Sequence, residues 1–139
     1  MNAEKPTGAA RKAMLDEHAI IQAVLAQYQL PLDGWHGIAH WARVYENGTM
    51  LAEKQGFLGE QITVIKLFAM LHDACRHDEY EDSEHGPRAA ALALRMFHGK
   101  HPGVMLKLSQ DGFDRLYTAI FEHTTGDPKR EFPDISACW

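Results

Sequence analysis

An almost unbroken apolar run, Ile62 to Leu71, constrains the fold of this chain more than any other segment. A surface helix is apolar along one stripe only, whereas a helix that is apolar nearly all round is buried among its neighbours. We therefore predict a helix over residues 60–75 in the middle of a bundle. His72 and Asp73 follow the run directly. An imidazole and a carboxylate at the end of a buried helix are costly to desolvate unless a cation binds them. The segment therefore also predicts a metal site.

Apolar residues recur at helical spacing in four further segments on either side of this run. We predict helices over residues 9–30, 38–53, 86–97 and 111–124. Asn47-Gly48 is expected to weaken the second of these helices. Residues 76–84 are acidic and nearly free of apolar side chains, which predicts a loop. No segment alternates as a strand does, so the sequence predicts an all-α fold, a bundle of about five to six helices.

Length and charge limit the partners that this chain can have. Its 139 residues, 45% of them hydrophobic, suit one globular domain spanning residues 1–139. The net charge of −5 argues against a nucleic acid or an anionic membrane as partner. No apolar stretch reaches the ~20 residues of a membrane span, and residues 1–10 lack the apolar core of a signal peptide. Two cysteines make no disulfide framework, so a cytoplasmic location is expected. The sequence does not indicate an oligomeric state.

Nine histidines are several times what average usage would give in a chain of this length. Neutral imidazole is the commonest nitrogen ligand of transition metals. We interpret His18, His98 and His101 as surface residues. A polar stripe along the second helix faces either solvent or a site, and it consists of His36, His40, Arg43 and Asn47. His123 projects from an apolar stripe, where a lone histidine is more often hydrogen-bonded in the core than a ligand.

Four motifs in a fixed order carry a resemblance to a known family. In chain order they are His40-Trp41-Ala42-Arg43-Val44, Leu71-His72-Asp73-Ala74-Cys75-Arg76, Glu84-His85-Gly86-Pro87-Arg88-Ala89-Ala90 and Glu122-His123-Thr124-Thr125-Gly126. Over roughly residues 15–126 they resemble the HD-domain superfamily of metal-dependent phosphohydrolases. The His-Asp dipeptide alone is weakly specific, and the ordered series on successive helices is more so.

The resemblance implies a metal-ligand set. In that family the first His, the His-Asp pair and an Asp on a late helix bind one divalent metal, which implies His40, His72 and Asp73 as ligands. Further histidines of the family bind a second metal or the phosphate. This implies His85 and His123 here, with His77 a weaker candidate.

The resemblance also implies the catalytic residues. A basic residue three positions after the family's Asp often faces the substrate phosphate, and here it is Arg76. With Asp73, His85 and His123, Arg76 makes up the expected catalytic set. The acidic loop can supply a general acid or base, for which Asp78 is one candidate and Glu79 the other.

The family's late Asp has no clear counterpart in this chain. The carboxylates after His123 are Asp127, Glu131 and Asp134. In similar relatives the terminal Cys-Trp runs directly into an acidic helix that holds that Asp. We therefore expect one of three situations: the chain lacks its C-terminal helix, Asp134 or a partner substitutes, or the site is incomplete.

The side chains themselves favour phosphoryl chemistry. Imidazole and carboxylate ligands without thiolate suit Mn²⁺, Fe²⁺, Ni²⁺, Co²⁺ or Mg²⁺ in near-octahedral geometry. Such an ion activates water and polarises a phosphoryl oxygen. Arg76 and Arg88 can neutralise a phosphate, or they simply pair with Glu79, Glu81 or Glu84 of the loop.

Two main functions remain open at this level. The first is a hydrolase for a small-molecule phosphate ester or nucleotide. The second is a non-catalytic ligand-binding or regulatory domain that keeps the histidines but lacks a fourth protein ligand. A haem-binding bundle or a pure interaction module fits less well, because adjacent His and Asp have no role there.

Overall fold

The computed structural model describes residues 15–125 as an all-α bundle, which confirms the predicted fold class. Five α-helices and one short 3-10 helix follow one another, and these residues contain no strand. The elements are α2 (Glu17–Gln27), α3 (Ile38–Lys54), α4 (Glu60–Leu71), α5 (His85–Phe97), α6 (Gln110–Glu122) and η1 (His123–Thr125). None of the helices described is long and apolar enough to cross a membrane.

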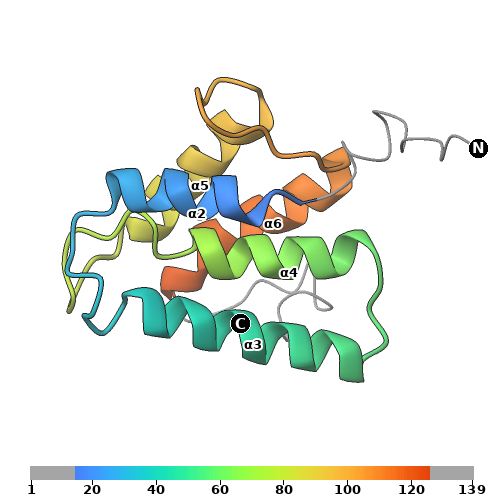
Figure 1. Ribbon diagram of the computed structural model, residues 1–139, viewed down its shortest axis with the longest axis horizontal. Helices are drawn as coiled ribbons and strands as arrows, with labels where there is room; N and C mark the ends of the chain where they lie inside the picture. Colours follow the sequence, from blue (N-terminus) through green and yellow to red (C-terminus); the bar gives the residue numbers. More distant parts are fainter. Residues whose placement is uncertain (1–14, 126–139) are drawn as a thin grey trace, which may run out of the picture.

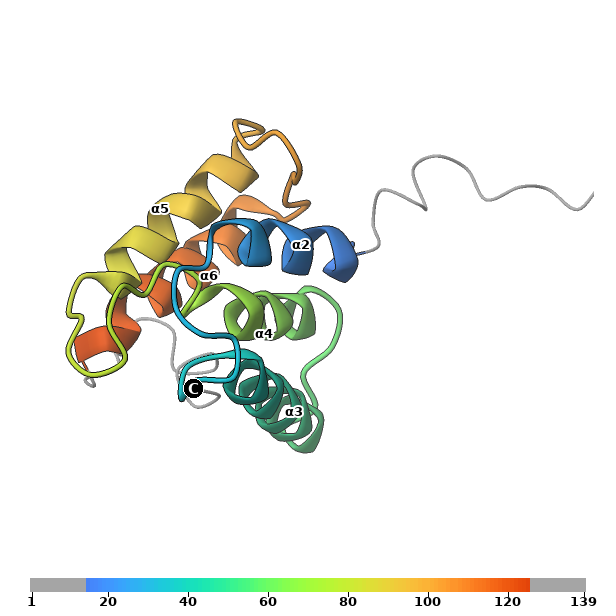
Figure 2. The same ribbon diagram turned by 60° about the vertical axis from the view of Figure 1, so that its left-hand side comes forward.

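Helix α4 is the central element, as its apolar sequence predicts. It lies between α3 on one side and α2 and α6 on the other (Figure 1, Figure 2). Its buried side chains cover every face of its second half, from Val64 to Leu71 except Lys66. Each large apolar side chain buried in this way contributes roughly 1.5–3 kcal/mol relative to an exposed one. Helix α5 packs on the far side of α6 and completes the bundle (Figure 2).

The central helix ends earlier than predicted. Helix α4 stops at Leu71, and residues 72–75 form turns instead of continuing to residue 75. Tighter backbone bonds replace the helical ones: Ala74 N–H donates to Leu71 C=O at 3.0 Å, and Arg76 N–H donates to Asp73 C=O at 3.2 Å. The carboxylate of Asp73 therefore projects from a turn at the carboxyl end of α4.

The first described helix is also shorter than predicted. Helix α2 begins at Glu17, where the Asp16 side chain accepts a hydrogen bond from Ala19 N–H, and it ends at Gln27. Tyr28 then takes an extended conformation, with ψ 129°, two residues before the predicted end of the helix at residue 30. The predicted residues 9–14 lie outside the described part. Helix α3 runs through the Asn47-Gly48 pair without a break, because Gly48 is buried in the helix packing.

The predicted loop over residues 76–84 is confirmed and is tied down by Asp82. The Asp82 carboxylate accepts a hydrogen bond from His77 N–H at 2.6 Å and pairs with Arg88 Nη2 at 2.5 Å. Arg88 Nε also donates to Cys75 C=O at 3.1 Å. The loop is thereby held against the first turns of α5, close to the carboxyl end of α4.

Candidate metal centre

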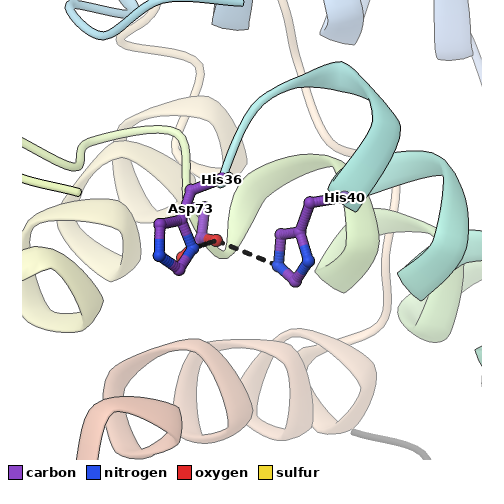
Figure 3. Close-up of side chains that lie close together, drawn as sticks. All are labelled: His36, His40 and Asp73. Atoms are coloured by element: carbon purple, nitrogen blue, oxygen red, sulfur yellow. Dashed lines mark hydrogen bonds and ion pairs between the residues drawn. The ribbon is translucent and has the colours of Figure 1, made fainter. Parts of the chain in front are cut away.

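The carboxylate of Asp73 lies at the centre of a cluster of histidines. The side chain is 3% exposed. Its Oδ2 atom faces three imidazole nitrogens: His36 Nδ1 at 3.3 Å, His40 Nε2 at 3.1 Å and His72 Nε2 at 3.3 Å. The rings of His36 and His40 both turn toward this carboxylate (Figure 3). We call these three histidines with Asp73 the first half-site.

The other oxygen of Asp73 faces a second group. Oδ1 lies 3.1 Å from His85 Nε2 and 3.6 Å from His123 Nε2. Arg76 Nε lies 3.3 Å from the same oxygen. We call His85, His123 and Asp73 the second half-site. One buried carboxylate is thus shared between two sets of imidazoles. The potential ligand atoms of His36, His40 and Asp73 lie close enough together to hold a metal ion, and so do those of Asp73, His85 and His123.

Different elements of the fold bring these side chains together. His40 lies in the first turn of α3, and His85 is the first residue of α5. His72 and Asp73 follow the last residue of α4, and His123 opens η1 directly after α6. The ring of Phe68 stacks on His72 at 4.9 Å and lies edge-on to His123 at 5.7 Å. The packing of α3, α5 and α6 around α4 therefore creates the cluster.

Backbone carbonyls determine which nitrogen of each ring carries the hydrogen. His72 Nδ1 lies 3.1 Å from the carbonyl oxygens of Phe68 and Ala69. His85 Nδ1 lies 2.5 Å from Asp82 C=O, and His123 Nδ1 lies 2.5 Å from Ile120 C=O. A carbonyl oxygen only accepts, so each Nδ1 must donate, and the Nε2 of a neutral ring then carries a lone pair. Metal-binding histidines are oriented by outer hydrogen bonds of this kind.

The Nε2 atoms of the cluster lie close together in pairs, and in one pair, His85 and His123, both atoms carry lone pairs. His85 Nε2 and His123 Nε2 are 2.9 Å apart, and His40 Nε2 and His72 Nε2 are 3.1 Å apart. Neutral rings in these tautomers cannot form a hydrogen bond across the first gap, so a cation is required there, either a proton or a metal ion. Burial lowers the pKa of His123 against the raising effect of Asp73, which disfavours the proton near neutral pH. The donor set therefore fits a metal ion.

Asp73 is anionic in this environment. Burial by itself raises the pKa of the Asp73 carboxyl, but the interactions of His72, His123 and His40 with it lower the pKa more, so the pKa lies well below its usual value. The cluster opens into a cavity of about 350 Å³, whose other walls come from Val44, Phe68, Arg76 and Thr124. A cavity of this size suits a small ligand.

The structure brings together the five predicted metal ligands and Arg76. His40, His72, Asp73, His85 and His123 lie in one cluster, and Arg76 lines the same cavity. The roles of these residues in catalysis stay predictions. His77 is exposed, and Asp127, Glu131 and Asp134 lie outside the described residues.

Two sequence interpretations need revision. His36 is not on the helical stripe that we assigned to it, because it precedes Gly37, the N-cap of α3, and lies in a loop. It was not among our predicted ligands, although its spacing from His40 in a polar stripe was the available signal. Arg88 pairs with Asp82 instead of the acidic residues at 79, 81 and 84, and Glu79 accepts a hydrogen bond from Trp35 N–H at 2.9 Å.

Comparison with known proteins finds no relative of this chain. No family model, no curated protein and no solved structure matches the chain. The fold and the site together define an all-α protein with a His/Asp cluster that can bind a metal ion.

Proposed function

We propose that this protein is a metal-dependent phosphohydrolase of the HD-domain type that acts on a small-molecule phosphate ester or nucleotide. The observation that carries the proposal is the single buried carboxylate of Asp73 between two sets of imidazoles with outward lone pairs. The ordered histidine motifs of the sequence support the same family. A buried carboxylate surrounded by imidazole lone pairs is costly to desolvate, and a metal ion between these groups would offset that cost further than the neighbouring Arg76 does.

The metal would be held by the ligands that the sequence motifs predict, which are His40, His72, Asp73, His85 and His123. A bound divalent ion supplies Lewis acidity toward a phosphoryl oxygen and lowers the pKa of water. The Asp73 carboxylate provides the negative charge that either half-site shares, and the imidazoles provide neutral nitrogen donors. The backbone carbonyls that accept from His72, His85 and His123 keep those rings in the orientation that binding requires.

Arg76 is the residue that we assign to the substrate phosphate. It is 8% exposed and lines the cavity beside the cluster. Its Nη1 donates to Asp78 C=O at 2.7 Å and its Nε lies beside Asp73, which together hold the guanidinium in place. A guanidinium binds phosphate oxygens through paired N–H groups, so it can orient the ester and offset charge that develops during attack.

Phe68 forms an apolar wall of the cavity beside the cluster. Phe68 is 4% exposed and contacts His72 and His123 through ring stacking and an edge contact.

The test combines metal analysis with a hydrolysis panel. Protein purified without chelator is analysed for bound metals, then assayed with p-nitrophenyl phosphate, bis-p-nitrophenyl phosphate and a set of nucleotides in the presence of Mn²⁺, Fe²⁺, Co²⁺, Ni²⁺ or Mg²⁺. We expect bound metal and metal-dependent release of phosphate or nitrophenol, both lost in Asp73→Asn. Bound metal without hydrolysis of any substrate would favour the regulatory domain instead. Absence of metal binding would refute the metal centre itself.

A further inference from the structure

We propose that His36 is a direct metal ligand, bound through Nδ1, and that it completes the first half-site as three imidazoles and one carboxylate. This inference rests on the proposed metal centre and adds to it a residue outside the motifs that carry the family resemblance. It also assigns the class of cofactor: a transition-metal ion of the Fe²⁺ to Zn²⁺ series in preference to Mg²⁺.

The hydrogen bonding of His36 points its lone pair at the cluster. Its Nε2 lies 3.1 Å from the backbone carbonyl of Glu79, which can only accept, so Nε2 carries the hydrogen. Nδ1 of the neutral ring then has a lone pair, and it lies 3.3 Å from the Asp73 Oδ2 atom. A lone pair facing a carboxylate oxygen is repulsive unless a cation lies between them. His40 Nε2 converges on the same oxygen, and the three ligand atoms form a group that can hold a metal ion (Figure 3).

The loop that carries His36 is built to hold this position. The Tyr28 hydroxyl donates to His36 C=O at 3.0 Å. On the preceding residue, Trp35 N–H donates to the Glu79 carboxylate at 2.9 Å. Glu79 therefore binds both the backbone beside His36 and the imidazole itself, and it joins residues 43 positions apart in sequence. A loop held at three points loses little conformational entropy when its side chain binds a ligand.

The residue after His36 is restricted to glycine by its surroundings. A Cβ atom on Gly37 would lie 2.0 Å from the carbonyl oxygen of Leu32. The chain therefore turns tightly between Leu32 and the start of α3, and Ile38 N–H closes the turn by donating to Leu32 C=O at 3.0 Å. This close approach places His36 one turn before His40, on the side of α3 that faces Asp73.

The completed ligand set decides the class of metal. With His36, the first half-site offers three nitrogen donors from His36, His40 and His72 and one carboxylate oxygen from Asp73. Mg²⁺ prefers oxygen ligands and keeps several waters, whereas imidazole suits ions such as Fe²⁺, Ni²⁺ and Zn²⁺. We therefore remove Mg²⁺ from the candidates for this half-site.

The experiment measures metal binding directly, with Co²⁺ as the probe. The full chain is stripped of metal and titrated with Co²⁺ in competition with a chelator, while the visible d–d absorption is recorded. The test variant is His36→Asn, whose amide occupies roughly the place of Nδ1 and keeps a hydrogen-bonding group there. The matched control is His98→Asn, at an exposed histidine outside the cluster. His36→Gln serves as a second variant, and circular dichroism checks that each protein is folded.

We expect both His36 variants to weaken Co²⁺ binding at the first half-site. The loss of affinity should exceed the roughly 10–100-fold that loss of an outer-shell partner costs. The Co²⁺ spectrum should change with the loss of a nitrogen ligand, the control should match the wild type, and millimolar Mg²⁺ should not displace Co²⁺. Wild-type affinity and spectrum in both His36 variants would overturn the inference. So would loss of hydrolysis with unchanged Co²⁺ binding, because it would assign His36 to the substrate.

Failure of the proposed function gives a different result. If the wild type binds Co²⁺ with the His36-dependent spectrum but hydrolyses no substrate, the inference about His36 holds and the phosphohydrolase proposal falls. If the wild type binds no Co²⁺, both fall together.

Discussion

Replacement of Asp73 by asparagine is the most informative single perturbation of the candidate metal centre. The change preserves the shape of the side chain but removes the one carboxylate that both half-sites share. It should therefore weaken metal binding at both half-sites, whereas loss of one histidine should weaken only one of them.

The size of the effect of Asp73→Asn on thermal stability follows from the linkage between metal binding and folding. A metal present at one hundred times its Kd stabilises the folded state by about 2.7 kcal/mol. Loss of even an outer-shell partner weakens metal sites by roughly 10–100-fold, so loss of a shared anionic ligand should cost about 100-fold or more. At the same metal concentration the stabilisation then falls to about 0.4 kcal/mol or less. For a domain of 139 residues this difference corresponds to a metal-induced rise in Tm that is smaller by roughly 7–9 °C.

The assay is thermal unfolding of each protein with and without Co²⁺. The metal-free variant should itself be less stable by up to about 3 kcal/mol, because the buried Arg76 loses a charged hydrogen-bond partner but keeps Asp78 C=O. Since the metal-induced shift is measured against each protein's own metal-free Tm, that loss does not affect the comparison. Asp111→Asn, at an exposed side chain paired with Arg115, is the matched control.

A clear result would refute the reasoning. If Asp73→Asn shows the same Co²⁺-induced shift as the wild type and as Asp111→Asn, the cation that the cluster requires does not depend on the shared carboxylate. The metal centre would then have to be placed elsewhere in the chain.

Three other outcomes are expected. Arg88→Ala removes the ion pair with Asp82, whose carbonyl orients His85, so the Kd of the second half-site should rise about 10–100-fold in a Co²⁺ titration while the first is unchanged. His123→Ala should lower turnover more than it lowers Co²⁺ content at the first half-site, and equal losses would contradict separate half-sites. Burial lowers the pKa of His123 below 6.5, so the unfolded chain binds this proton more tightly. The contribution of neutral His123 to the stability of the metal-free protein should therefore be fully present above pH 6.5 and be lost as pH falls through the folded pKa. A Tm that falls equally between pH 7 and 5 in His123→Gln would exclude this residue as a cause.

The helices themselves were largely predictable because helical periodicity is a local property. The apolar run that forms α4 is buried in the structure as its sequence requires, and α3 begins at Ile38 as predicted. The errors lie at helix ends. Helix α4 gives way to turns at His72, and α2 ends at Gln27, in both cases through backbone conformations that the apolar pattern does not encode.

Part of the candidate site was also predictable from the sequence, and part was not. Adjacent His72 and Asp73 at the end of a buried helix mark a place where a cation is needed, and this follows from the cost of desolvating them. His36 could not be assigned from sequence, because its orientation depends on the Glu79 carbonyl, a contact between two loops. The sequence alone determined the buried central helix and the polar residues at its end. Only the tertiary structure decided which histidines share the carboxylate, because the packing of helices around α4 and hydrogen bonds between distant loops set the direction of each ring.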